Sequence, residues 1–187
     1  MSSRARLGLL AVGAVGAVVL AAAAGGLTLQ QTADRADVNP ITDRQELDRT
    51  GREALRLVNF DAARVGYTIS FEPGRAGVRA QTDRATKRVS VFLRHGDSPT
   101  VVAHDVAHEL GHAYDDARMV TADRGAYLAR RGAASAPWEP DGASDYAVGA
   151  GDFAEVFALC HSASPDFRGR LAPRPVDACV LLPSGAR

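Results

Sequence analysis

The apolar positions change their period along the chain, and these changes predict the order of its elements. Over 42–63 the apolar residues recur every three to four positions, which indicates an amphipathic helix. Over 67–71 the period falls to two, as in a half-buried strand. Two further strands are predicted at 78–82 and 88–94, and three further helices at 99–118, 121–131 and 152–161. This order predicts an α+β fold in which a short twisted sheet packs on a long helix.

The beginning of the chain does not fit this pattern. Two arginines precede a stretch at 7–29 that has no charged residue and is rich in alanine, valine, leucine and glycine. Such a stretch is typical of a secretory signal peptide, and it is also long enough for a membrane anchor. We therefore assign 1–26 to a signal peptide or N-terminal membrane anchor, 27–41 to a linker and 42–187 to a single domain. Both alternatives place the domain outside the cytoplasm, either secreted or anchored to the membrane.

The charge of the chain is balanced, with 22 Lys and Arg residues against 22 Asp and Glu residues among 187. Because binding to nucleic-acid phosphates needs a clear basic excess, this balance excludes nucleic acid as the main partner. The length suits one ordinary domain, and we expect a monomer.

The chain has only two cysteines, Cys160 and Cys179, and both lie in the region that would be exported. In an oxidising compartment two cysteines pair more readily than they remain free. No Cys-x-x-Cys pair is present that would indicate a cysteine-based zinc site. We therefore predict a disulfide between Cys160 and Cys179.

The sequence His108-Glu109-Leu110-Gly111-His112 is an HExxH motif inside the long predicted helix. Residues four apart share one helix face, so both imidazoles can bind a single Zn²⁺ ion. Glu109 then lies beside the metal, where it can take a proton from the attacking water. Gly111 is a poor helix former and suits a place where a side chain would obstruct close packing beneath the metal. We predict that His108 and His112 bind zinc and that Glu109 is the general base and acid.

Residues near the motif have two interpretations each. His104 either supports the metal site or faces solvent, since it lies four positions before His108. Either Asp115 or Asp116 accepts the N–H of the second imidazole, or both belong to a solvated helix end. The strand 88–94 is either a platform to which an extended peptide adds or an ordinary sheet strand.

Residues 87–162 also resemble the anthrax-lethal-factor-like metallopeptidases, a gluzincin group that includes secreted bacterial Pro-Pro endopeptidases. The resemblance rests on His-Glu-Leu-Gly-His-Ala-Tyr-Asp-Asp (108–116), on Ser-Asp-Tyr (144–146) and on Asp-Phe-Ala-Glu-Val-Phe-Ala-Leu-Cys-His-Ser (152–162). It implies a small zincin-like domain in which a second, later helix carries a glutamate as the third zinc ligand. It also implies a tyrosine that helps to hold the oxyanion, and this tyrosine maps to Tyr146.

One position departs from the family pattern, which usually has two acidic residues four apart, the first binding zinc and the second supporting it. Aligned on Phe-Ala-Glu-x-Phe, Glu155 falls on the second of these positions, and the ligand position falls on Gly151. Three arrangements are open: the helix shifts by about a turn and Glu155 binds zinc, Asp152 binds instead, or zinc is held by two histidines and water. Glu155 is our predicted third ligand, with Asp152 as the alternative.

These residues together predict an exported zinc-dependent metalloendopeptidase that hydrolyses a peptide or protein substrate through a zinc-activated water. The alternative is a non-catalytic, zinc-stabilised binding domain of the cell envelope, which would account for the displaced third carboxylate. A membrane is a partner only if the N-terminal segment is not cleaved.

Overall fold

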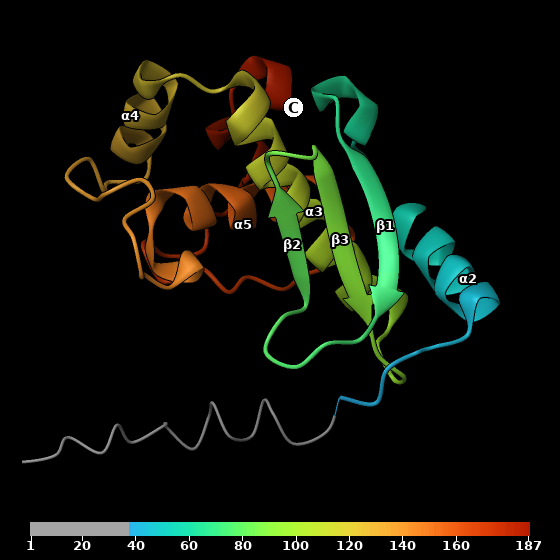
Figure 1. Ribbon diagram of the computed structural model, residues 1–187. Helices are drawn as coiled ribbons and strands as arrows, with labels where there is room; N and C mark the ends of the chain where they lie inside the picture. The colour runs from blue at the N-terminus through green and yellow to red at the C-terminus, as the bar shows by residue number, and fades with distance from the viewer. Residues whose placement is uncertain (1–37) are drawn as a thin grey trace, which may run out of the picture.

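The computed structural model describes residues 38–187 and shows an α+β domain, as predicted (Figure 1). Its helices are α2 (Arg44–Leu55), α3 (Pro99–Arg118), α4 (Thr121–Arg130) and α5 (Gly149–His161), and its strands are β1 (Thr68–Pro73), β2 (Ala80–Asp83) and β3 (Arg88–Leu93). The predicted export segment 1–26 and most of the predicted linker 27–41 lie outside the described residues. Within the described part, no helix has both the length and the apolar character needed to cross a membrane.

The first helix is shorter than the predicted 42–63, because the chain turns away to pair with a distant segment. Its N-terminus is capped by the carboxylate of Asp43. Beyond its end, the Asn59 amide donates to the carbonyl oxygen of His161 at 2.7 Å. This tertiary contact with the end of α5 replaces the hydrogen bonds that a longer helix would have made.

The three strands form one mixed sheet in the order β1-β3-β2, with β3 parallel to β1 and antiparallel to β2. The buried side chains Val89, Val91 and Leu93 of β3 belong to the hydrophobic core. Because β3 is paired on both edges, it is an ordinary sheet strand, and the interpretation of 88–94 as a peptide platform is wrong. The edge strand beside α3 is β2.

The long helix α3 packs between the sheet and α5 (Figure 1). It starts with a Ser98 cap and with Pro99 in its first turn, two residues that favour the start of a helix. A Cβ atom on Gly111 would lie 2.7 Å from the Cα of Ala154 in α5. The glycine in the motif therefore allows the two helices to approach each other closely.

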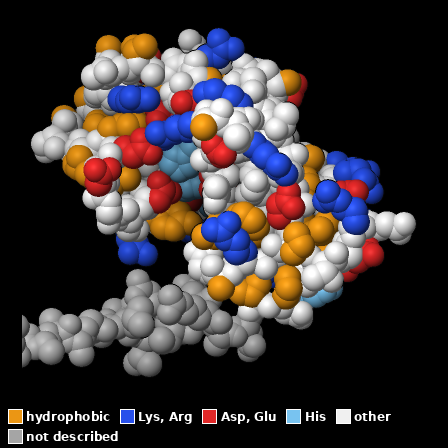
Figure 2. Space-filling view, viewed as in Figure 1, with side chains coloured by type: hydrophobic (Ala, Val, Ile, Leu, Met, Phe, Trp, Pro, Cys, Tyr) orange, Lys and Arg blue, Asp and Glu red, His pale blue; other side chains and the backbone are white. Residues whose placement is uncertain are grey.

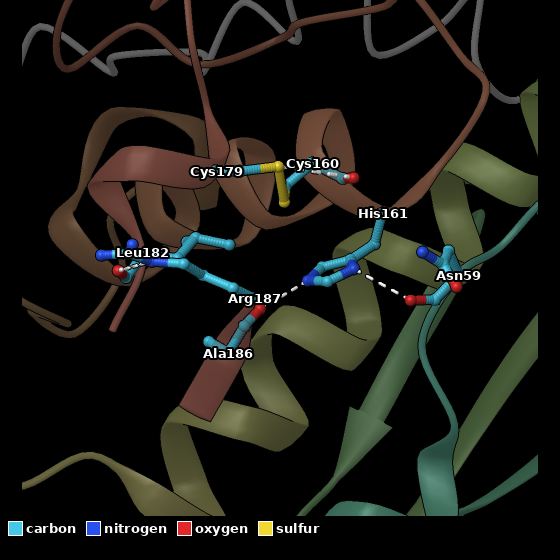
Figure 3. The surroundings of a disulfide bond; sticks show 7 residues. All are labelled: Asn59, Cys160, His161, Cys179, Leu182, Ala186 and Arg187. Carbon is cyan, nitrogen blue, oxygen red and sulfur yellow. Dashed lines mark hydrogen bonds between the residues drawn. A yellow bond between two sulfur atoms is a disulfide. The ribbon is translucent and has the colours of Figure 1, made fainter. Parts of the chain in front are cut away.

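The predicted disulfide between Cys160 and Cys179 is present and ties the end of α5 to the C-terminal segment (Figure 3). The neighbouring His161 faces two main-chain oxygens, that of Asn59 with Nδ1 at 3.0 Å and that of Ala186 with Nε2 at 2.6 Å. Burial lowers the pKa of His161 below its usual value and outweighs the two carbonyl contacts, which favour the charged ring. His161 is therefore a packing residue that joins three segments.

Candidate metal centre

One face of α3 presents three histidines, His104, His108 and His112, at intervals of four residues. His104 and His108 are buried, whereas His112 is partly exposed. The exposed end of the row opens into a cleft of about 750 Å³ beside β2. Figure 2 shows histidine atoms at the base of a hollow that is bordered by charged side chains of both signs. A metal ion could enter at this end of the row.

Three side chains converge at the open end, and we call them the outer group: His108, His112 and Asp145. The Nε2 atoms of His108 and His112 are 3.2 Å apart. Asp145 starts a short 3-10 helix, Asp145–Ala147, and its Oδ2 lies 2.9 Å from Nε2 of His108. Its Oδ1 lies 3.3 Å from Nε2 of His112. These three residues could hold a metal ion.

Asp145 reaches this position because Gly151 leaves room for its backbone. A Cβ atom on Gly151 would lie 1.8 Å from the carbonyl oxygen of Asp145 and 2.4 Å from its carbonyl carbon. Position 151 aligns with the zinc ligand of the resembling family. Here the backbone of Asp145 occupies the space that a side chain at position 151 would need, and Asp145 brings its own carboxylate to the histidines. Sequence reasoning missed Asp145, although an aspartate directly before Tyr146 and a glycine at the ligand position were both visible signals.

Gly151→Ala should displace Asp145 and lower the affinity of the outer group for zinc by about tenfold or more, as when a ligand loses its support. The contact is with main-chain atoms, so no flexible side chain can move aside. Competition with a fluorescent zinc chelator measures the affinity. Gly125→Ala in α4 is the matched control, because a Cβ there meets open space. An unchanged affinity in Gly151→Ala would contradict this account of Asp145.

A second set, the inner group, lies deeper on the same helix face and consists of His104, His108 and Glu155. One oxygen of Glu155, Oε1, lies 2.8 Å from Nδ1 of His108 and 3.1 Å from Nε2 of His104. The other oxygen accepts from the amide of Arg168. Burial raises the pKa of Glu155, but the hydrogen bonds from both histidines outweigh this and hold it well below its usual value. These buried residues could also hold a metal ion, and His104 does not face solvent.

The structure does not bring the predicted ligands His108, His112 and Glu155 to one point. Glu155 contacts Nδ1 of His108, whereas His112 approaches Nε2 on the other side of the ring. Glu155 therefore contacts the Nδ1 side of His108, opposite the Nε2 atom that faces His112 and Asp145.

The alternative ligand Asp152 belongs to neither group. It is fully buried and accepts from the Tyr127 hydroxyl at 2.6 Å and from the Arg131 guanidinium at 2.7 and 2.9 Å. These contacts join α5 to α4 and its C-terminal end. Asp152 has a structural role here, away from the histidines.

His108 lies between the carboxylates of both groups. Burial lowers the pKa of His108, but its hydrogen bonds to Asp145 and Glu155 and the charge of Glu109 outweigh this and raise it well above the usual 6.5. Burial raises the pKa of Asp145, yet the bonds from His108 and His112 bring it below its usual range. A proton on His108 thus competes with a metal ion, and metal affinity falls as the pH falls.

The two predicted catalytic residues line the same cleft as the outer group. Glu109 is buried beside His108, and its Oε2 lies 2.7 Å from the Thr82 hydroxyl of β2. The ring of Tyr146 lies 5.6 Å from that of His108, between centroids. The carboxylate and the phenol therefore face the cleft from α3 and from the segment before α5.

The acidic pair at the end of α3 has other partners than the second histidine. Asp115 is buried and accepts from Arg124 at 2.7 Å and from Trp138 at 3.0 Å. Asp116 accepts from Lys87 at 2.5 Å. The interpretation that Asp115 or Asp116 accepts from the second imidazole is wrong, because Arg124, Trp138 and Lys87 donate to these two carboxylates instead.

No family model matches this chain, and no curated protein or solved structure is significantly similar to it. Its likeness to the lethal-factor-like metallopeptidases therefore stays a resemblance of short sequence blocks. The chemistry of the site must be inferred from its own geometry.

Proposed function

We propose that this protein is an exported zinc-dependent peptidase whose zinc is held by His108, His112 and Asp145. The observation that carries the proposal is the convergence of three ligand atoms, Nε2 of His108, Nε2 of His112 and Oδ2 of Asp145, which lie 2.9, 3.2 and 3.4 Å from one another. Ligand atoms bound at about 2.0–2.1 Å to a tetrahedral zinc are about 3.3 Å apart. The residues of the outer group therefore fit this ion.

The outer group suits a catalytic zinc better than the inner group does. Two histidines, one carboxylate and a fourth position open to a cleft are the usual composition of such sites. In the inner group, Glu155 is enclosed and already accepts from the Arg168 amide. Its bond to Nδ1 of His108 fixes the tautomer that leaves the Nε2 lone pair free for the metal. We assign the inner group to this supporting role.

The side chains around the outer group can perform peptide hydrolysis. Zinc bound there would act as a Lewis acid and lower the pKa of a water to about 7. Glu109 would take the proton from the attacking water on its carboxylate and pass it to the leaving amine. Thr82 orients this carboxylate, and the Tyr146 hydroxyl would donate to the carbonyl oxygen as charge develops on it. Water is thereby added across the peptide bond, which gives a carboxylate and an amine.

The edge strand β2 supports a peptide as the substrate. The Phe92 amide of β3 donates to the carbonyl oxygen of Arg79. In an antiparallel pair this bonding alternates, so Ala80 and Thr82 turn their main-chain groups away from β3. An extended peptide can pair with these groups and pass Glu109 at the level of Thr82.

The test is to titrate the purified protein with zinc and to incubate it with a broad peptide library. We expect about one zinc per chain and peptide cleavage that a chelator abolishes and added zinc restores. Zinc binding without hydrolysis of any peptide would favour the alternative, a non-catalytic zinc-stabilised binding domain. A protein that binds no zinc would overturn both.

A further inference from the structure

An ion pair closes one end of the cleft. Arg84 follows β2 directly, and Glu139 lies in the loop before Asp145 on the opposite wall. Their side chains form two parallel hydrogen bonds of 2.8 Å, and both residues line the cleft. Because the pair joins the two walls on either side of the HExxH helix, we call it the end wall.

The end wall is held by a buried carboxylate behind it. Both side chains of the pair are exposed, at 40% for Arg84 and 49% for Glu139, and such a pair is weak by itself. Here Asp115 is fully buried and accepts from the indole N–H of Trp138, the residue before Glu139, at 3.0 Å. The guanidinium of Arg84 lies 4.0 Å from the same carboxylate. Arg84 and the residue before Glu139 therefore both contact Asp115 of α3.

The end wall makes the cleft asymmetric about the proposed zinc. The catalytic carboxylate of Glu109 lies at the level of Thr82 on the edge strand. From Thr82 the cleft extends two residues to Arg84 and five residues to Gly77. At about 3.3 Å per residue the side towards Arg84 is about 7 Å long, whereas the other side continues beyond Ala80, the first residue of β2, into the turn at Gly77. A peptide on this edge has room for about two residues between the zinc and the end wall, and for more on the other side.

The direction of the peptide determines which of its ends meets the end wall. Antiparallel pairing is the more stable arrangement, and β2 runs towards Arg84. An antiparallel peptide therefore runs away from the end wall, with its amino terminus against it. The carboxylate of Glu139 has acceptor sites beyond the two that Arg84 uses, so it can also accept from an ammonium group.

We propose that Glu139 of the end wall binds the amino terminus of the substrate, so that the enzyme removes dipeptides from amino-terminal ends. The proposal rests on the proposed peptidase function and narrows the predicted endopeptidase activity. Water adds across the second peptide bond, and the products are a dipeptide and a shortened peptide with a new amino terminus. Glu139 is then the residue that determines where cleavage occurs.

The first test measures binding without turnover. An alanine hexapeptide with a fluorophore at its carboxyl end, either free or acetylated at its amino terminus, is titrated with zinc-loaded Glu109→Gln protein and followed by fluorescence anisotropy. The free peptide should bind about tenfold more tightly, since its ammonium makes a charged hydrogen bond. Adding Glu139→Gln should remove the difference, and adding Asp141→Asn, an exposed acid in the same loop, should keep it. Equal affinities for the two peptides would overturn the proposal.

The second test maps cleavage positions in a library of longer peptides by mass spectrometry. Wild-type protein should cleave after the second residue, and acetylation of the amino terminus should lower kcat/KM about tenfold. Internal cleavage unrelated to the amino terminus would overturn the proposal and leave the peptidase function standing. Release of dipeptides from the carboxyl end would overturn it as well, because it requires the opposite direction. Zinc binding with no cleavage of any peptide would overturn the peptidase function itself.

Discussion

Replacing Asp145 with alanine should lower the affinity for zinc by more than the roughly 10–100-fold that loss of a supporting residue costs. Asp145 supplies one of the three converging ligand atoms, and among residues 38–187 no second carboxylate belongs to the outer group. Glu155→Gln should have a smaller effect, within that range, because it removes only the support of Nδ1 of His108. Competition with a chromophoric zinc chelator gives the zinc affinity of both variants and shows which of them binds zinc more weakly.

The exposed residue Asp141 lies in the same loop as Asp145 and provides the control. Asp141→Asn removes a negative charge near the cleft without touching the ligand atoms, and its zinc affinity should equal that of the wild type. If Glu155→Gln weakened zinc binding more than Asp145→Ala, the metal would belong to the inner group. The assignment of Asp145 would then be wrong.

Glu109→Gln should lower kcat for peptide hydrolysis by about 10²–10⁴-fold and leave the zinc content unchanged. Glutamine has nearly the same size and can still accept from the Thr82 hydroxyl, but it cannot take a proton from water. Steady-state kinetics at saturating peptide gives kcat, and elemental analysis gives the zinc content of the same preparation.

The matched control for Glu109→Gln is Glu53→Gln on α2, whose partner Arg49 lies on the same helix, far from the motif in sequence. This variant should retain wild-type activity. If Glu109→Gln also retained it, another group would have to be the general base. If it lost zinc, Glu109 would be needed for the metal site itself, and its loss of activity would say nothing about proton transfer.

The elements that local signals define were predicted closely from the sequence. The helix at 99–118 has both of its predicted ends, and its start follows from Ser98 and Pro99, which are signals that act on their own neighbours. The helix predicted over 42–63 ends early at Leu55, since its C-terminal half instead contacts the end of α5, about a hundred residues later. No periodicity within 42–63 carries information about that partner.

The candidate site likewise contains residues that local sequence signals predict and one residue that they do not. His108, Glu109 and His112 lie within one helical turn, so their common placement follows from helix geometry alone. Asp145 comes from a short 3-10 helix outside any periodic element, and its position depends on contact with Gly151. Such a contact depends on the folded loop, so the sequence placed His108, Glu109 and His112 together but pointed to Glu155 instead of Asp145 as their partner.

The disulfide links the redox state of the surrounding solution to the proposed metal site. The segment 161–178 that it closes carries Arg168, whose amide holds Glu155, and Arg170, whose amide donates to the carbonyl of Tyr146 at 2.6 Å. A reductant that opens the bond would let this segment move, and Glu155 and Tyr146 would lose those contacts. Thiol reagents would then weaken the site in two ways, by binding zinc themselves and by loosening the residues that support it. Handling in an oxidising buffer would preserve the zinc affinity.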